Sequence, residues 1–269
     1  MIGEEIRLSR IFGQGNAVVV AIDHGLYNGP LPGMIDLPRV ITTVSKADAI
    51  VMSPGMVSHC KSVFMDPSAP ALIIRLNWGT QYATQWAYDT AQSVRVVSAQ
   101  DALALGADIA LVGLSLKTGE QALDAHNIEV LSEYIAEKRH VGIPLIGEFF
   151  PAGAEDTSPE SLQELVAIGC RVISELGVDA IKTFFTGERF SEIVAATPVP
   201  ILALGARKMP RESDALLLAQ RAVQAGARGV VFGRNVIQAL QPDRFLTALQ
   251  EVVKEGHSAD SVARAYGLT

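Results

Sequence analysis

Eight short apolar runs, rich in β-branched residues, recur along this chain between longer amphipathic segments. The runs are nearly continuous rather than alternating, which is typical of parallel strands that helices cover on the outside. They span residues 17–22, 49–53, 71–76, 108–113, 144–149, 180–184, 200–204 and 229–233. A barrel of eight βα units takes roughly 250 residues, and this chain has 269. We therefore predict an α/β protein in which residues 1–269 form one domain, a (β/α)8 TIM barrel.

The segments between the runs carry helix signals. Ser158 before Pro159 is a favourable helix start, and Gly177 is a natural stop. Ser98 with Asp101 resembles a capping box. Similar joins from helix to strand recur at residues 46–51, 106–111, 177–182 and 226–231. This repetition suits βα units in series, and we interpret the joins as tight turns without chemistry.

A doubly wound open sheet is the competing fold. Its first strand is usually followed by a G-x-G-x-x-G turn, and residues 23–29 do not fit that pattern. No Pro/Ser-rich linker or low-complexity stretch divides the chain, and 49% of its residues are apolar. That composition fills one large core.

The net charge and the cysteine content limit the kinds of ligand and partner that we expect this chain to bind. A net charge of -7 argues against nucleic acid, which calls for a basic surface, but local N–H groups and cations still bind a small anion. Cys60 and Cys170 lack metal-ligand spacing, so we expect neither a metal site nor a cofactor. The charged N-terminus is unlike a signal peptide, and no apolar run approaches the ~18 residues of a membrane span. We expect a cytoplasmic homo-oligomer that acts on a small molecule, away from membranes.

Functional residues in such a barrel lie at the C-terminal ends of the strands. Lys182 lies within a buried strand, where desolvation lowers a lysine pKa and provides the free amine that attacks a carbonyl. Alternatively, it extends past the strand end or pairs with a carboxylate. Asp23, which with His24 directly follows the first strand, either moves a proton and orients a substrate hydroxyl or caps the next turn.

Two further strand ends carry candidates. Gly205 and Arg207 follow the seventh strand, and Gly233 and Arg234 follow the eighth; such adjacent glycine-bearing loops often bind phosphate, the alternative being solvated turns. Glu148 ends the fifth strand among apolar neighbours. It either has a raised pKa and acts as acid or base, or forms a salt bridge with a cation such as Lys182 or Arg75.

Two other pairs of residues look structural. Trp78 and Trp86 flank a polar loop after the third strand, where they form a lid or a packing patch. We expect His59 and Cys60 in a surface loop.

Several of these motifs, taken together, resemble the class I aldolase family of the deoxyribose-phosphate and archaeal-type fructose-bisphosphate aldolase group. That group includes aminodeoxyheptulosonate synthase and the autoinducer-2-processing thiolase. The resemblance covers essentially the whole chain and is strongest at residues 6–12, 23–25 with 29–30, 181–183 with 186–187, and 233–238. It implies a Schiff base at Lys182, proton transfer assisted by Asp23, and a substrate phosphate bound near Gly205, Gly233 and Arg234.

The chain departs from this family pattern at two places. The family's fifth strand usually ends in aromatic-Pro-Arg-Gly with a tyrosine that transfers a proton, whereas this chain has Phe150 followed by Pro-Ala-Gly. We hypothesise that Glu148 takes over that role. The double glycine of the seventh-strand loop is Gly205-Ala206 here, which alters the fit to a phosphate.

Three functions stay open at this point. The first is a lyase, specifically an aldehyde-lyase that cleaves or forms a C–C bond in a phosphorylated ketose or related sugar phosphate. The second is an acyl or ketol transferase of the same family. The third is a sugar-phosphate isomerase or a non-catalytic barrel that binds a ligand.

Overall fold

Eight parallel strands close into a barrel in this computed structural model, which describes residues 2–268 apart from the side chain of Glu155. The order around the barrel is β1-β10-β9-β8-β7-β6-β3-β2. The strands are β1 (Ala17–Ala21), β2 (Ala49–Met52), β3 (Ala71–Arg75), β6 (Ile109–Leu114), β7 (Leu145–Phe149), β8 (Ala180–Phe184), β9 (Ile201–Leu204) and β10 (Gly229–Phe232). The predicted TIM barrel is confirmed, and each predicted strand agrees with the structure to within one residue at either end.

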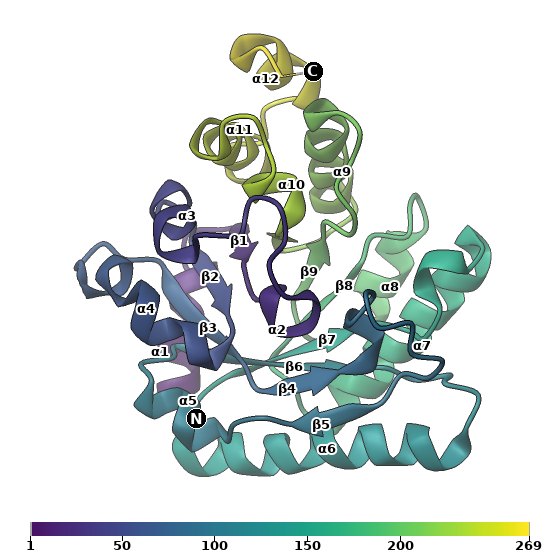
Figure 1. Ribbon diagram of the computed structural model, residues 1–269. Helices are drawn as coiled ribbons and strands as arrows, with labels where there is room; N and C mark the ends of the chain where they lie inside the picture. Colours follow the sequence, from purple (N-terminus) through teal and green to yellow (C-terminus); the bar gives the residue numbers. More distant parts are fainter. Residues whose placement is uncertain (1, 269) are drawn as a thin grey trace.

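Helices surround this barrel (Figure 1). They are α1 (Ile2–Phe12), α2 (Gly25–Asn28), α3 (Leu37–Thr43), α4 (Val57–Cys60), α5 (Ala99–Ala104), α6 (Gln121–Val141), α7 (Pro159–Leu176), α8 (Phe190–Ala196), α9 (Glu212–Gln224), α10 (Arg234–Ile237), α11 (Pro242–Lys254) and α12 (Ala259–Tyr266). The capping predictions are confirmed, because the Ser158 hydroxyl accepts the Ser161 N–H and Ser98 forms a capping box with Asp101. Cys60, expected in a surface loop, is instead buried at the end of α4.

Two apolar clusters form the core. One fills the space between the strands and the outer helices, and the other fills the inside of the barrel. Leu8, Ile11 and Phe12 of α1 pack against the inner cluster. Arg7 also donates a hydrogen bond to the carbonyl of Gly142, just before β7. Helix α1 therefore closes the N-terminal end of the barrel, and the opposite end remains for a site.

The repeated helix-to-strand joins have a common structural role. Three of them place an aspartate just before a strand, and its carboxylate accepts a backbone N–H from the neighbouring strand at 2.7 to 2.8 Å. The pairs are Asp48 with Val18, Asp108 with Leu72, and Asp179 with Leu145. Each aspartate also pairs with a basic side chain, from Lys254, Arg10 and Lys138 respectively. These contacts fix strands against each other and agree with our interpretation that the joins carry no chemistry.

An antiparallel hairpin, which the sequence did not predict, leaves the barrel after β3. It consists of β4 (Asn77–Gly79) and β5 (Ser93–Arg95), with a short 3₁₀ turn, η3 (Thr80–Tyr82), between them. Further 3₁₀ turns are η1 (Pro54–Met56), η2 (Lys61–Met65) and η4 (Ala154–Asp156). Asn127 of α6 accepts the Ser93 N–H at 2.9 Å, which holds the hairpin between α6 and the barrel (Figure 1).

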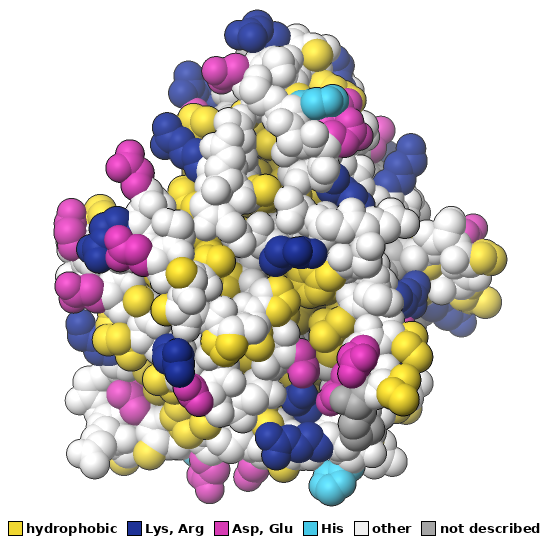
Figure 2. All heavy atoms as spheres, turned by 180° about the vertical axis from the view of Figure 1, so that it is seen from behind, with side chains coloured by type: hydrophobic (Ala, Val, Ile, Leu, Met, Phe, Trp, Pro, Cys, Tyr) yellow, Lys and Arg dark blue, Asp and Glu magenta, His cyan; other side chains and the backbone are white. Residues whose placement is uncertain are grey.

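The surface opposite the view of Figure 1 carries acidic and basic side chains in alternation. Figure 2 shows no single-sign patch spread across that face. Among residues 2–268, no helix combines the length and apolar character needed to cross a bilayer.

Candidate active site

Charged side chains point into the barrel near the C-terminal ends of three strands. They do so because alternate residues of these strands face the inside of the barrel along its whole length. In a strand, alternate residues point to the same face. On β3, β7 and β8, a residue of the inner apolar cluster is followed two positions later by a charged one. These pairs are Ile73 with Arg75, Ile146 with Glu148, and Ala180 with Lys182. The site therefore lies directly on the apolar core at the C-terminal ends of the strands.

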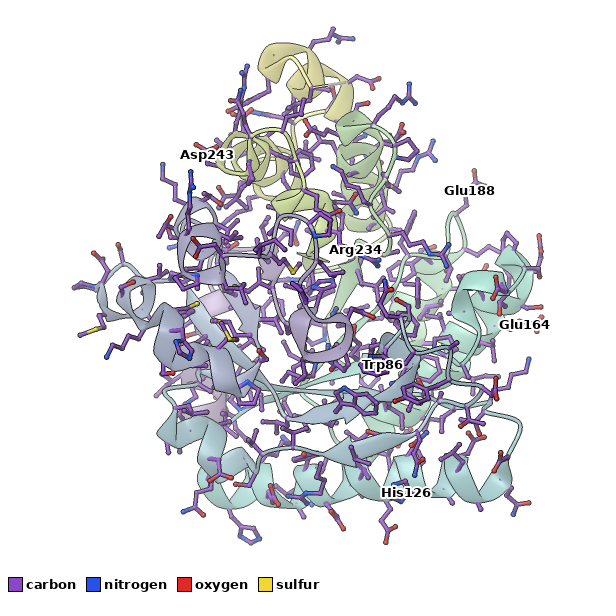
Figure 3. The ribbon with its side chains drawn as sticks, viewed as in Figure 1. Trp86, His126, Glu164, Glu188, Arg234 and Asp243 are labelled. Atoms are coloured by element: carbon purple, nitrogen blue, oxygen red, sulfur yellow. The ribbon has the colours of Figure 1, made fainter. Side chains whose placement is uncertain are left out.

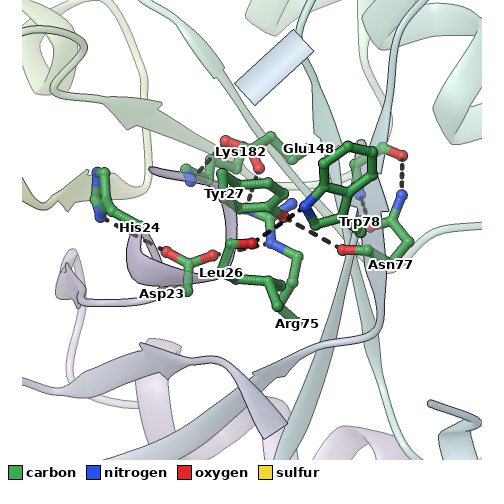
Figure 4. A network of polar contacts seen from close by, with 10 residues as sticks. Asp23, His24, Leu26, Tyr27, Arg75, Asn77, Trp78, Glu148 and Lys182 are labelled. Atoms are coloured by element: carbon green, nitrogen blue, oxygen red, sulfur yellow. Dashed lines mark hydrogen bonds and ion pairs between the residues drawn. The ribbon is translucent and has the colours of Figure 1, made fainter. Parts of the chain in front are cut away.

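Four side chains form a continuous ion network at this level (Figure 4). The Arg75 guanidinium donates from Nε to Asp23 Oδ2 at 2.9 Å and from Nη2 to Glu148 Oε2 at 2.5 Å. Lys182 Nζ lies 2.6 Å from Glu148 Oε1. The four side chains are each at most 8% exposed, so the two cations and two carboxylates neutralise each other away from water.

Both carboxyl groups in the network are held ionised. Burial acts to raise the pKa of Glu148, but the positive charges of Arg75 and Lys182 outweigh it, so the pKa lies below its ordinary value. Burial likewise acts to raise the pKa of Asp23 and the charge of Arg75 acts to lower it. The net result is again a lowered pKa. The predicted raised pKa of Glu148 is therefore wrong, whereas the alternative of a salt bridge with Lys182 or Arg75 is what the structure shows, and with both.

A cavity of about 380 Å³ opens above the network. Its volume falls within the ~300–1,000 Å³ typical of small-molecule sites. All four network residues line it, together with four of the predicted binding residues: His24, Gly205, Gly233 and Arg234. Arg207 is not among the described residues that line the cavity; its backbone carbonyl accepts a hydrogen bond from Asn235 at 3.1 Å.

His24 lies between the network and the strand-ten loop. Its Nδ1 is 3.9 Å from Asp23 Oδ1, and its ring fills the space that a side chain at position 233 would need. Burial lowers the pKa of His24 to about 4, against the opposing charge of Asp23. The imidazole is therefore neutral near pH 7, and Arg234 is the cation on this side of the cavity.

The two late loops meet at the cavity rim. Arg234 Nη2 donates to the Ala206 carbonyl at 3.0 Å, and Figure 3 shows Arg234 at the mouth of the barrel. A Cβ on Gly233 would lie 2.4 Å from His24 Cε1, so only glycine lets the backbone approach here. Ala206 adopts a φ of 50°, the left-handed region that favours glycine. The loop therefore keeps a glycine-like turn despite the alanine.

The hairpin and the loop after β1 form one wall of the cavity. Trp78 Nε1 donates to the Leu26 carbonyl and Trp86 Nε1 to the Tyr27 carbonyl, each at 3.1 Å. Asn28 donates in turn to the Tyr82 carbonyl at 2.9 Å. The two tryptophans thus act as a packing patch that ties the two segments together.

The rings of Phe150 and Tyr82 are in edge-to-face contact beside the cavity. Their ring centroids are 5.2 Å apart, and Tyr82 also lies over the Arg75 guanidinium at 5.0 Å. Sequence reasoning missed Tyr82 and its neighbour Gln81, because they lie in a hairpin whose strands have only three residues each. Arg75 was considered only as a partner for Glu148. Its position, a charge within a run of apolar strand residues, is the same kind of signal that identified Lys182.

Comparison with known proteins places the chain in a family. The model of the DeoC/LacD family aldolases matches residues 17–239. The chain belongs to this family. It is 35% identical over 265 residues to an uncharacterized aldolase of Saccharolobus solfataricus, covering 95% of this chain and 96% of that protein. It is 30% identical over 281 residues to the 3-hydroxy-5-phosphonooxypentane-2,4-dione thiolase of Escherichia coli, covering 99% and 86%.

A solved structure resembles this DeoC/LacD family aldolase over most of its length. It is an archaeal fructose-1,6-bisphosphate aldolase whose catalytic lysine is covalently bound to the carbinolamine intermediate of its substrate. The TM-score is 0.81 at 29% identity, covering 93% of this chain and 98% of that one. The family and this neighbour support a lyase-type enzyme that acts on a small molecule.

Proposed function

We propose that this aldolase forms a Schiff base between Lys182 and a phosphorylated ketose or related sugar phosphate, and cleaves or forms a C–C bond next to it. The observation that carries the proposal is the 2.6 Å contact between Lys182 Nζ and Glu148 at the floor of the cavity. An amine must lose a proton before it attacks a carbonyl. Glu148 is placed to accept that proton, and the transfer leaves the total charge of the buried network unchanged.

The chemistry then follows from the groups around Lys182. Nζ adds to the substrate carbonyl carbon, and a proton then passes from Nζ to the former carbonyl oxygen to give a neutral carbinolamine. Protonated Glu148 returns its proton to that hydroxyl, which leaves as water, and an iminium remains. A base removes the proton from the hydroxyl on the carbon beyond the scissile bond, and the C–C electron pair moves to the iminium, giving an enamine and a free aldehyde. Protonation of the enamine carbon and hydrolysis by water release the second product and restore Lys182.

Asp23 is the group we assign to the hydroxyl proton. Asp23 lines the cavity, and its lowered pKa keeps the carboxylate ionised near pH 7. Arg75 holds Asp23 at 2.9 Å and so fixes it relative to Glu148. With the two proton transfers divided between two carboxylates in this way, neither step needs a hydroxyl at position 150, where this chain has phenylalanine.

We place the substrate phosphate at the loops that carry Gly205, Gly233 and Arg234. The close backbone approach at Gly233 and the guanidinium of Arg234 provide N–H donors and one positive charge at the cavity rim. The neutral imidazole of His24 provides a hydrogen-bonding group beside them. Arg207 remains a predicted second contact to the phosphate, although it is not among the described residues that line the cavity.

Borohydride trapping tests the proposal. The protein is incubated with dihydroxyacetone phosphate and reduced, and the adduct is mapped by mass spectrometry. We expect a stable adduct on Lys182 and none on Lys138, a buried lysine of α6 that pairs with Asp179. Lys182→Met should give no adduct. Absence of an adduct on wild-type Lys182 with every ketose and ketose phosphate tried would favour isomerisation or ligand binding.

A second candidate is acyl transfer, because the chain is 30% identical to a thiolase. Both reactions would use the same iminium, and they differ in the acceptor. Product analysis with coenzyme A, with an aldehyde, and with neither distinguishes them. Turnover that requires coenzyme A identifies a transferase, and release of a free aldehyde without an acceptor identifies a lyase.

A further inference from the structure

The cavity wall opposite the phosphate loops contains polar atoms that the chain itself does not satisfy. In the barrel order, β3 lies across from β9 and β6 across from β10, so the hairpin after β3 faces the loops of Gly205 and Gly233. Lys182 and Glu148, on β8 and β7, lie between these two sides. A substrate bound at Lys182 with its phosphate at one side therefore extends its other end towards Gln81 and Tyr82.

Gln81 and Tyr82 are incompletely hydrogen bonded. Within residues 2–268, the buried Gln81 Oε1 and Nε2 have no hydrogen-bond partner. The buried Tyr82 hydroxyl interacts with the Arg75 guanidinium but has no hydrogen bond of normal geometry. Arg75 Nη1 is in the same condition. A buried polar atom without a partner costs roughly 1–3 kcal/mol, and native proteins contain few of them. The partnerless amide of Gln81 and the poorly hydrogen-bonded hydroxyl of Tyr82, on neighbouring residues that line one cavity, indicate a site that a ligand completes.

These atoms also define what the ligand must offer. Gln81 Nε2 and Arg75 Nη1 only donate, Gln81 Oε1 only accepts, and the Tyr82 hydroxyl does both. A hydroxyl group matches this mixture because it also donates and accepts. A phosphate dianion or a carboxylate would satisfy the donors but would place negative charge against Gln81 Oε1.

The charges at this wall argue against a second phosphate. Among the described residues that line the cavity, the only cations are Arg75, Lys182 and Arg234. Arg75 already bridges Asp23 and Glu148, and Arg234 lies with the late loops. Two further carboxylates, Asp89 and Asp156, line the cavity as well. An additional anion at the hairpin would therefore be repelled.

We infer that Gln81 and Tyr82 form a subsite for the uncharged, hydroxyl-bearing half of the substrate, so that the substrate carries a single phosphate, at the end held by the Gly205 and Gly233 loops. This inference rests on the proposed Schiff base at Lys182. The aldehyde half of the substrate, which leaves in cleavage and enters in condensation, then binds on the hairpin side of the cavity.

Condensation of dihydroxyacetone phosphate with two acceptors that differ only by a phosphate tests the inference. The acceptors are D-glyceraldehyde and D-glyceraldehyde 3-phosphate, and the measured quantity is kcat/KM for the acceptor. We expect D-glyceraldehyde to be preferred by at least ~10-fold. Preference for the phosphorylated acceptor would overturn the inference.

Two variants test the residues. Gln81→Met and Tyr82→Phe should each raise the KM for D-glyceraldehyde by about 10-fold, and leave borohydride trapping of dihydroxyacetone phosphate at Lys182 unchanged. Thermal stability should stay the same or rise for Gln81→Met, because the deleted amide atoms have no partner among the described residues. Tyr82→Phe should lower it slightly, because the hydroxyl interacts with Arg75. The matched control is Tyr134→Phe. The Tyr134 hydroxyl donates to the Leu76 carbonyl at 2.7 Å, so its loss should lower the melting temperature and leave KM unchanged.

These measurements test the subsite and the proposed function separately. The subsite is overturned if the KM for D-glyceraldehyde is unchanged in both variants, or if either variant loses borohydride trapping. Trapping at Lys182 in the wild-type protein supports the proposed function in either case. Absence of wild-type trapping overturns the proposed function and the subsite with it.

Discussion

Glu148 and Lys182 are register partners on the neighbouring strands β7 and β8, and their side chains meet at 2.6 Å inside the barrel. Adjacent positions on one face of a sheet bring such side chains together without any loop. The ion pair is therefore positioned by the barrel itself. Arg75, reaching across from β3, adds the second cation that Glu148 needs to stay ionised beside the apolar core.

Replacement of Glu148 tests its proposed role as a proton carrier. Glu148→Gln keeps the size of the side chain but cannot take the proton from Lys182. We expect turnover to fall at least ~100-fold, the usual effect of losing a general acid–base. The control is Glu212→Gln, a buried residue outside the cavity that accepts the Leu240 N–H and keeps an acceptor oxygen after replacement. Equal turnover of the Glu148 variant and wild type would remove the role.

Arg75 should be essential for stability as well as for the site. Arg75→Met leaves Asp23 and Glu148 buried without their shared partner, and breaking a buried pair in this way costs about 3–5 kcal/mol. The free energy of unfolding in urea at pH 7 measures this loss. Arg75→Lys retains the charge and should lose less. A cost below about 1 kcal/mol for Arg75→Met would show that water, rather than Arg75, solvates the two carboxylates.

The low pKa of His24 predicts a loss of stability in mild acid. The folded protein keeps His24 neutral down to pH about 4, whereas the unfolded chain takes up the proton below its ordinary value of 6.5. Stability from this group is therefore complete above 6.5 and declines as pH falls towards 4, by about 2–3 kcal/mol at pH 4.5. Urea unfolding of wild type and His24→Gln between pH 7 and 4.5 measures the difference in slope. Identical slopes would contradict the prediction.

The aspartates at the strand joins should differ in importance according to their cations. Asp179→Asn leaves Lys138, whose side chain is only 6% exposed, with the weaker partner Glu4 at 3.3 Å. We expect a loss of about 1–3 kcal/mol. Asp108→Asn leaves Arg10, which is 43% exposed, so the loss should be about 0–1 kcal/mol. Thermal unfolding compares the two, and equal losses would mean that burial of the cation does not matter here.

Much of the candidate site was accessible from local sequence. Glu148 and Asp23 could be identified because each places a charge where an apolar run ends, and Lys182 because it places a charge within a buried strand. The direction of the pKa shift of Glu148 could not be predicted from local sequence, because it depends on Arg75, which is 73 residues away in the chain. Gln81 and Tyr82 could not either, since a hairpin with three-residue strands has too little alternation to be recognised.

The amino-acid sequence alone determined the eight strands, the capped helices and the level of the barrel at which charged groups occur, because these depend on the spacing of apolar residues and on local backbone preferences. The tertiary structure decided which charges meet. Closure of the barrel brings Arg75, Glu148 and Lys182, from three strands, and Asp23, from the turn after β1, into one network. Their mutual electrostatics, rather than any local pattern, set the protonation of the site.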